Sequence, residues 1–351
     1  MNPPLPFSVF RLRSQPAWPV LLAGSLLLAG AARAAETVTI RMGTILPSGT
    51  PQYKIIQEMV EQWRKDSADS VKVILYPDGR LGGESEMVKK MRIKQLGAGV
   101  LTAVGLSEID RGVAGLQLIP MAFRTWEEVD YVREKLRPLL EGQLRAKGYE
   151  VLFWADAGWV RFFSKSPAVR PDDYRKMKMF TWSGDVRQAD IMRSAGFRAI
   201  SLETTDMLLG LNTDMINVVP VPPLIALAGQ LNGPAPHMLD LNWSPIVGAT
   251  VVRTDLWEKI PADLRAKLRA AAEIAGEKAR TQGRRESDEA VKTMQQRGLT
   301  VHAVPADAEP EWRTLVESVN PHIRGDLVPA DVFDAVQKHL ADFRRGGVGA
   351  P

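Results

Sequence analysis

The sequence predicts an α/β fold with two lobes, and three features of the chain predict it. Strand and helix patterns alternate along the first third of the chain, which is typical of parallel βα units. Short aromatic strands follow at 153–182, near the middle of the chain. The longest helical pattern covers 261–297 and would reach ~55 Å at ~1.5 Å per residue, longer than one small domain is wide. We therefore expect this helix to span both lobes, with Gly283 as a candidate bend.

The first predicted elements place two loops at the end of strands. Residues 36–42 alternate between apolar and polar side chains, as a strand does, and 71–76 form a second strand. Helices follow these strands, one with its apolar face at 53–63 and one at 84–94. Ligands bind beyond the carboxyl ends of parallel strands, so the loops 44–50 and 77–83 are cleft candidates. Gly79, Gly82 and Gly83 match no phosphate-binding pattern, and we interpret them as turn residues.

The later part of the chain predicts a second set of strands and helices. Asp185 is a plausible N-cap for a helix at 186–195. A strand at 215–219 is expected to end at Pro220, because proline cannot donate a ladder hydrogen bond. The other expected strands are 100–104, 149–154, 177–181, 238–241 and 247–252, and the other expected helices are 126–147, 205–211 and 331–343.

The N-terminus has the pattern of an export signal. Arg11 and Arg13 precede an apolar run at 18–32, and Ala32-Arg33-Ala34 fits a small-x-small cleavage site. A retained N-terminal anchor is the alternative. Cleavage after residue 34 removes three arginines and no acidic residue, so the formal charge falls from +4 to +1. Without cysteine, the exported chain has neither a lipoprotein anchor at the cleavage point nor disulfides or thiolate metal sites.

Composition and motifs argue against an enzyme. The 351 residues are 45% hydrophobic and 25% charged, which is ordinary for globular proteins and provides material for two domains. The four histidines are scattered and show no metal-binding spacing, and no GxSxG motif is present. No basic patch with interleaved aromatic residues indicates nucleic-acid binding. We therefore expect no catalysis, no cofactor and no bound metal.

A binding cleft asks only for apolar walls and a few orienting polar groups, and the central stretch has both. Its tryptophans and phenylalanines could wall a ligand cleft or be part of the core. Arg161, between Val160 and two phenylalanines, needs an anionic partner. That partner could be a ligand carboxylate, or it could be Asp156 or Asp185 in an internal salt bridge.

Several motifs resemble a known receptor family. They are Tyr-Pro-Asp-Gly-Arg-Leu-Gly-Gly-Glu at 76–84, Gly-Trp-Val-Arg at 158–161, Pro-Asp-Asp-Tyr-Arg-Lys-Met-Lys-Met-Phe at 171–180 and Leu-Asn-Thr-Asp-Met-Ile-Asn at 211–217. Together they are similar to the DctP-like substrate-binding proteins of TRAP transporters. The resemblance implies a two-lobed periplasmic-binding-protein fold with a long helix across both lobes. It divides the chain into a signal peptide at 1–34, lobe I at 35–157 and 247–284, and lobe II at 158–246 and 285–351.

The chain departs from this family at one position that matters for the ligand. Members that bind carboxylates usually have an Arg directly after the Lys-x pair, where this chain has Phe180. Asp214 and Asn217 replace the usual Gly and Asp of the later motif, whereas Arg161 matches a second family Arg that often assists. A phenyl ring in place of a guanidinium removes an anion anchor and adds apolar surface. The predicted ligand-lining residues are Trp154, Trp159, Arg161, Phe180, Trp182, Val219, Pro222 and Trp243.

The resemblance implies a periplasmic solute receptor that closes its lobes on a small organic, partly hydrophobic ligand. Its expected partners are the membrane subunits of a TRAP permease, and a periplasmic tetratricopeptide-repeat protein is a further candidate. An ordinary carboxylate receptor that uses Arg161 as its anion anchor is the first alternative. A periplasmic scaffold without a transport role is the second.

Overall fold

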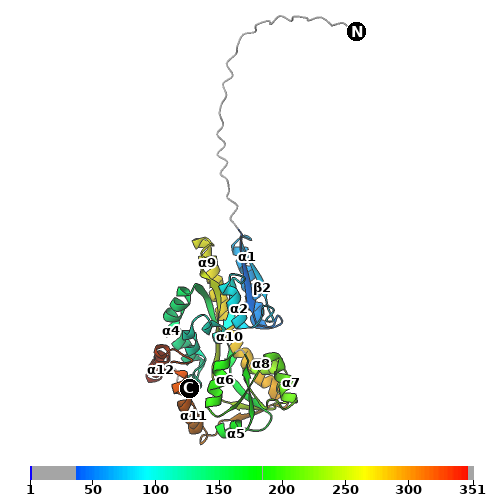
Figure 1. Cartoon of the computed structure of the whole chain (residues 1–351), viewed down its shortest axis with the longest axis vertical. Helices are drawn as coiled ribbons and strands as arrows, with labels where there is room; N and C mark the ends of the chain where they lie inside the picture. The colour runs from blue at the N-terminus through cyan, green and yellow to red at the C-terminus, as the bar shows by residue number, and fades with distance from the viewer. Residues whose placement is uncertain (2–36, 184, 347–351) are drawn as a thin grey trace. The chain divides into compact units, whose positions relative to one another are not determined.

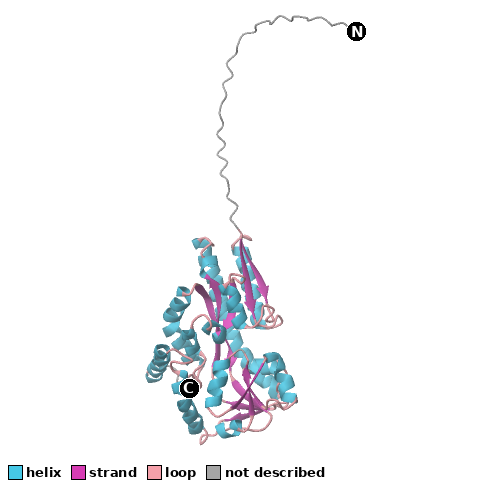
Figure 2. Cartoon of the chain, viewed as in Figure 1, coloured by secondary structure: helices cyan, strands magenta, loops and turns pink. Residues whose placement is uncertain are grey.

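Two β-sheets with helices around them make up the described chain. The computed structural model describes Met1 and residues 37–183 and 185–346. The described residues from 37 onward form one compact unit. Apart from Met1, the predicted signal peptide at 1–34 lies outside the described residues. The strands gather in two groups (Figure 2), which we call the first and second lobes together with their helices. The predicted α/β fold with two lobes is confirmed.

The first lobe has a five-stranded sheet in the order β2-β1-β3-β10-β4. β1 is parallel to β2 and β3, whereas β10 is antiparallel to both β3 and β4. The strands β1 to β4 therefore end at the same edge of the sheet. Their bounds are β1 Val38–Thr44, β2 Val71–Tyr76, β3 Ala98–Thr102, β4 Tyr149–Trp159 and β10 Pro245–Arg253.

The second lobe has a six-stranded sheet in the order β11-β9-β5-β8-β6-β7. Only β5 runs against its neighbours, because it pairs antiparallel with β8 and β9 while the other pairs are parallel. The other five strands therefore end at one edge, where β5 begins. Their bounds are β5 Arg161–Ser164, β6 Lys178–Trp182, β7 Arg198–Leu202, β8 Val218–Val221, β9 His237–Asp240 and β11 Thr300–Ala303.

Some helices lie around the first sheet and the others lie around the second (Figure 1). Around the first sheet lie α1 Pro51–Asp66, α2 Glu84–Arg92, α3 Ala103–Ser107, the 3-10 helix η1 Arg111–Leu116, α4 Trp126–Ala146, α9 Thr254–Trp257 and α12 Ala330–Arg345. Around the second lie α5 Pro171–Arg175, α6 Val186–Ser194, η2 Thr204–Asp206, α7 Met207–Asn212, α8 Pro223–Ala228 and α11 Glu309–Ile323. None of the helices in the described ranges is both long and apolar enough to cross a membrane.

Local sequence explains where these helices begin. Thr50 precedes α1 and accepts a hydrogen bond from the Tyr53 backbone N–H at 3.3 Å, while Pro51 occupies the first turn, where its missing N–H is no loss. The predicted cap Asp185 likewise accepts from the Gln188 N–H at 3.0 Å and starts α6. These caps use donors that the helix itself leaves without a partner.

One long helix, α10 Ala262–Gln295, packs against β4 and α1 of the first lobe and against α8 of the second. Two of its glycines let it lie close to β4. A Cβ at Gly276 would lie 2.6 Å from the Phe153 Cβ, and one at Gly283 would lie 2.6 Å from the Asp156 backbone oxygen. The predicted helix across both lobes is confirmed. Gly283 allows this close approach, and the helix continues through it without interruption.

Three hydrophobic clusters make up the core. One lies between the first sheet, α1 and α10, and another lies between the second sheet, α7 and α8. The largest covers the opposite face of the first sheet and continues onto the second, where Phe162, Trp243 and Trp312 pack ring against ring. The two lobes thus share one continuous core on this side.

Some details differ from the sequence-based expectations. The strand expected at 215–219 begins only at Val218, and it does not stop at Pro220 but continues to Val221. β6 pairs with β8 only at Met179 and Val218, so beyond Val218 one side of β8 needs no donor. The helix α12 packs on α4 beside the first sheet, with Phe343 against Tyr131 at 5.1 Å between ring centroids, although the predicted boundaries grouped it with the second lobe.

Candidate functional site

The carboxyl edges of the two sheets lie at the connections between the lobes. β4 ends at Trp159 and β5 begins at Arg161, so one residue carries the chain from the first sheet to the second. The return connection from β9 to β10 runs beside it, because the Val160 N–H donates to the Ser244 oxygen at 2.8 Å and the Trp243 N–H to the Val160 oxygen at 3.2 Å. The carboxyl ends of strands in both sheets, where the cleft is predicted, therefore lie near these two crossings and near α10.

On the first lobe, the predicted cleft loop at 77–83 is a tight turn. Asp78, Gly79 and Gly82 all have positive φ values, of 59°, 63° and 94°. For Gly79 and Gly82 this left-handed backbone is the reason for glycine, which confirms the interpretation of these residues as turn residues. A Cβ placed on Gly83 would lie 3.9 Å from the Trp182 ring at the end of β6. The two predicted cleft walls thus approach one another here.

Glu84 ties two loops of the first lobe together. Its buried carboxylate accepts hydrogen bonds from the Thr102 backbone N–H at 2.7 Å, the Thr102 hydroxyl at 2.6 Å and the Gly105 N–H at 3.0 Å. Burial raises the pKa of Glu84, and these hydrogen bonds oppose the shift. Glu84 belongs to the motif at 76–84, but nothing in the spacing pointed to α3 as its partner. It fixes the start of α2 to the end of β3 and the start of α3, at the carboxyl edge of the sheet.

Arg161 forms an ion pair with Asp240, across the edge of the second sheet. The pair follows from the strand register. Phe162 lies opposite Leu239 in antiparallel strands, so Arg161, one residue before Phe162, lies opposite Asp240, one residue after Leu239. Burial lowers the pKa of Arg161, and the charge of Asp240 opposes the shift. The internal salt bridge proposed from the sequence therefore exists, but its partner is neither Asp156 nor Asp185.

Asp156 instead belongs to a buried network that links β4, α4 and α10. Its carboxylate accepts from Arg133 at 3.3 Å and from the Arg284 Nε at 3.0 Å, and Asp130 bonds both arginines at 2.6 to 2.8 Å. The Arg284 guanidinium also lies 4.5 Å from the centre of the Trp126 ring. The network ties α10 to the end of β4, next to the crossing between the lobes.

The structure separates the predicted ligand-lining residues into two groups. Trp154, Trp159 and Trp243 belong to the core that continues across both lobes. Trp154 donates from its indole N–H to Glu141 at 3.0 Å, and the Trp159 ring packs on Trp126 at a tilt, with 4.6 Å between ring centroids. These rings therefore make their contacts within the protein.

The second group lies in the second lobe. Phe180 and Val219 are buried among the side chains of α7 and α8, with 5% and 0% of their surface exposed. Pro222 is buried beside Gly158, and Trp182 is partly exposed and packs on the same cluster. Trp182 and Arg161 are thus the two predicted residues that keep exposed surface at the carboxyl edge, and the ligand contacts of the whole set stay a prediction.

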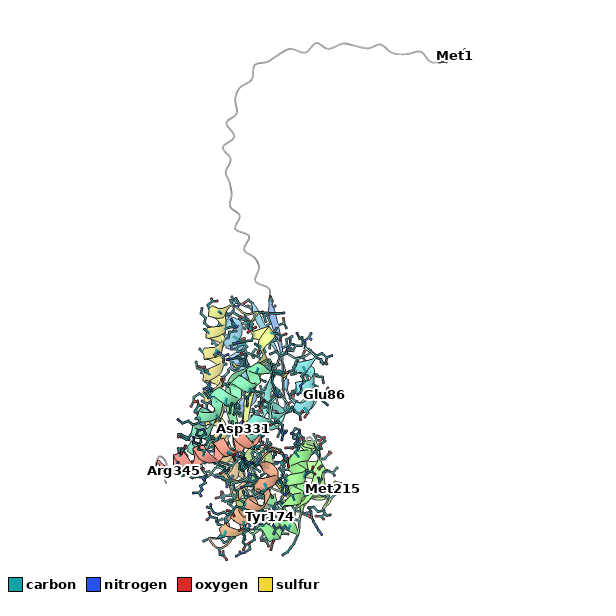
Figure 3. The ribbon with its side chains drawn as sticks, turned by 60° about the vertical axis from the view of Figure 1, so that its left-hand side comes forward. Met1, Glu86, Tyr174, Met215, Asp331 and Arg345 are labelled. Carbon is teal, nitrogen blue, oxygen red and sulfur yellow. The ribbon has the colours of Figure 1, made fainter. Side chains whose placement is uncertain are left out.

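Figure 3 shows which helices flank this region. Glu86 on α2 and Met215, which follows α7, lie on the same side of the described molecule in this view, one in each lobe. The described residues contain no group of three or more His, Cys, Asp or Glu side chains that could hold a metal ion. A ligand site between the two lobes stays a prediction.

Comparison with known proteins identifies the family. The sequence model of the bacterial extracellular solute-binding proteins, family 7, named DctP, matches residues 42–324. The C4-dicarboxylate-binding periplasmic protein DctP of Rhodobacter capsulatus is 24% identical over 313 residues, which cover 88% of this chain and 92% of that protein.

Solved structures agree with this assignment in fold. A TRAP periplasmic solute-binding protein from Ralstonia eutropha, with bound (S)-2-acetolactate, superposes with a TM-score of 0.79 at 15% identity and covers 87% of this chain and 99% of its own. DctP7 of Bordetella pertussis, which binds pyroglutamic acid, has a TM-score of 0.78 at 14% identity and covers 86% and 99%. The resemblance found in the sequence is confirmed: the chain belongs to the family 7 extracellular solute-binding proteins, and so to TRAP-type substrate receptors rather than to enzymes.

Proposed function

We propose that this receptor binds a small, partly hydrophobic organic ligand between the carboxyl edges of its two sheets. The pairing of Arg161 with Asp240 is the observation that supports this most strongly. Where the family resemblance leads us to expect an anion-binding Arg, the chain has Phe180, and the second expected Arg is already neutralised. A ligand carboxylate would compete with Asp240 for Arg161, whose Nη1 already forms this ion pair.

Trp182 is the residue that we expect to contact the ligand. Its indole lies at the end of β6, opposite Gly83 on the first lobe, and is partly exposed. An indole has a large apolar face and one N–H donor, so it suits a ligand with both apolar and polar parts. Phe180, two residues earlier on the same strand, belongs to the core cluster of the second lobe against which Trp182 packs.

Closure of the lobes would bring the two edges together. The crossings at Val160 and at 241–244 are short segments between strands, which suit a hinge, and α10 passes from one lobe to the other. After closure we expect the receptor to deliver its ligand to the membrane subunits of a TRAP permease. A periplasmic tetratricopeptide-repeat protein stays a candidate partner, and export through cleavage after residue 34 stays part of the proposal.

An ordinary carboxylate receptor is the second candidate. The relative from Rhodobacter capsulatus is named for C4-dicarboxylates, and similar structures contain galacturonate, pyroglutamic acid or acetolactate, all of which are organic acids. In this reading, the ligand carboxylate replaces Asp240 as the partner of Arg161. Arg161 would then be the main anion anchor, because Phe180 cannot serve as one.

Mass spectrometry of ligand that co-purifies with the exported chain would distinguish the two. Calorimetry would then compare that ligand with succinate, galacturonate and pyroglutamate. We expect Trp182→Ala to weaken binding by about tenfold and Trp182→Phe to retain most of it. We expect Arg161→Gln to have little effect, as should the exposed control Arg193→Gln.

The results that would refute the hydrophobic ligand are specific. Tight binding of one of these acids, lost in Arg161→Gln and strengthened in Asp240→Asn, would establish the carboxylate receptor instead. Phe180→Arg is less informative, because it would place a charge in the core of the second lobe and destabilise the fold. No binding of any ligand by a folded, exported chain would favour the scaffold.

A further inference from the structure

Two histidines that are far apart in the sequence meet on neighbouring strands. His237 begins β9 and His302 lies in β11. These strands pair in parallel, with β11 at the edge of the second sheet and β9 beside it. The His237 Nδ1 and the His302 Nε2 are 3.1 Å apart, and both residues are half-buried. They are 65 residues apart in the chain, with α10 between them, so spacing alone did not reveal the pair.

We propose that His237 and His302 form a binding site for a single divalent transition-metal ion of the zinc, nickel and copper class. Two nitrogens that bind one ion at ~2.0–2.1 Å, with an angle between 90° and the tetrahedral value, lie ~2.9–3.4 Å apart. The observed separation of 3.1 Å falls within this range. To bind an ion, each ring must turn so that its lone pair points at an ion beside the two nitrogens and no longer along the line between them.

The donor set favours borderline metals. Imidazole suits zinc, copper and nickel, whereas magnesium and calcium prefer oxygen ligands. No cluster of three or more His, Cys, Asp or Glu side chains exists in the described ranges, so water would complete the coordination. Both rings keep some exposed surface, which gives the ion and its waters access. Two protein ligands predict a modest affinity.

The protons can be accounted for without any other reactant. In the neutral pair, one ring donates its N–H to the lone pair of the other. When an ion binds, that ring exchanges its proton with solvent so that its other nitrogen carries it, and each imidazole still holds one proton.

The histidine pair shares no residue with the proposed ligand site. His237 lies at the amino end of β9, whereas Asp240 at the carboxyl end pairs with Arg161. A bound ion would join β9 to β11, the strand that follows α10, and so fasten the outer edge of the second sheet. A test of metal binding can therefore succeed or fail without changing the result of the ligand-binding tests.

The test is a titration of the chain from residue 35 onward, without a polyhistidine tag, with zinc chloride alone. Calorimetry should give one ion per chain, and zinc should raise the melting temperature, because it binds the folded state. Magnesium chloride should do neither. His237→Gln or His302→Gln should each weaken zinc binding by about tenfold or more, since two ligands on one ion reinforce each other.

His322→Gln is the matched control, because His322 is exposed on α11 and outside the pair. It should bind zinc as the unaltered chain does. Circular dichroism without metal would establish that each variant is folded. The proposal is overturned if the unaltered chain binds no zinc up to about 1 mM, a very weak affinity. It is also overturned if the double variant of His237 and His302 keeps the original affinity.

Discussion

The close approach of α10 to β4 predicts the effect of one methyl group. In Gly283→Ala, the new Cβ would lie 2.6 Å from the backbone oxygen of Asp156, a separation that real Cβ atoms essentially never show. The neighbouring atom belongs to the backbone, so no side-chain rotation relieves the contact. The helix or the end of β4 must move, and this would disturb the ion pairs between Arg284 and Asp156.

The magnitude follows from two opposing effects. Alanine favours a helix over glycine by about 0.8–1 kcal/mol. Overpacking in a closely packed interior costs about 1–3 kcal/mol, and here the contact is with backbone. We therefore expect Gly283→Ala to lower the free energy of unfolding by up to about 2 kcal/mol. Gly142 on α4 is the matched control, because a Cβ there meets nothing within 4 Å. Gly142→Ala should gain up to about 1 kcal/mol.

Urea unfolding, followed by circular dichroism, measures both variants against the unaltered chain. The slope with urea should stay the same, so that the change in midpoint reports stability. The reasoning about close packing is refuted if Gly283→Ala is as stable as Gly142→Ala. Opposite signs for the two substitutions would support it.

Two further predictions concern charge. Asp156→Ala should lower the free energy of unfolding by about 3–5 kcal/mol, because it leaves the buried Arg133 without that partner. Asp190→Ala, which breaks an exposed pair, should cost less than about 1 kcal/mol. Urea unfolding compares the two variants, and equal losses would contradict the prediction. The hydrogen bonds and charge of Arg145, helped by Arg269, hold the pKa of Glu150 below its usual 4.5. Its stabilisation is therefore complete above the unfolded pKa and lost as the pH falls, so the stability difference between the unaltered chain and Glu150→Gln should shrink below about pH 5 in melting experiments; a constant difference would count against it.

Much of the fold could be predicted because single segments carry its signals. The apolar face of α1, the alternation in β1 and the unusual length of α10 are all properties of adjacent residues, and each predicted element is present. Short strands such as β7 and β11 were missed, since four or five residues of mixed polarity have no clear period. β8 was ended too early because the rule against proline applies to strands that are paired on both sides.

The site was harder to predict because it depends on pairs of residues that are distant in sequence. Arg161 and Asp240 meet through strand register, and Glu84 meets Thr102 through the packing of α2 against β3. The sequence showed that Arg161 needs a partner, but several carboxylates were available, and only the order of strands selects among them. The buried tryptophans show the same limit, since aromatic composition does not distinguish a cleft wall from a core.

The position of Phe180 sharpens the argument about the ligand. An exposed ring would hold the ligand by direct contact, but the Phe180 ring lies in the core of the second lobe, in the cluster against which Trp182 packs. The loss of the expected arginine therefore acts mainly by removing charge from the carboxyl edge, since Asp240 neutralises the remaining Arg161. Of the two arginine positions expected from the family resemblance, one holds a phenyl ring and the other an ion pair, so we expect neither to select anions by attraction alone. Selection would then depend on the shape and apolar surface that Trp182 presents, which is why Trp182→Ala and Asp240→Asn are the two variants that separate a hydrophobic ligand from an acidic one.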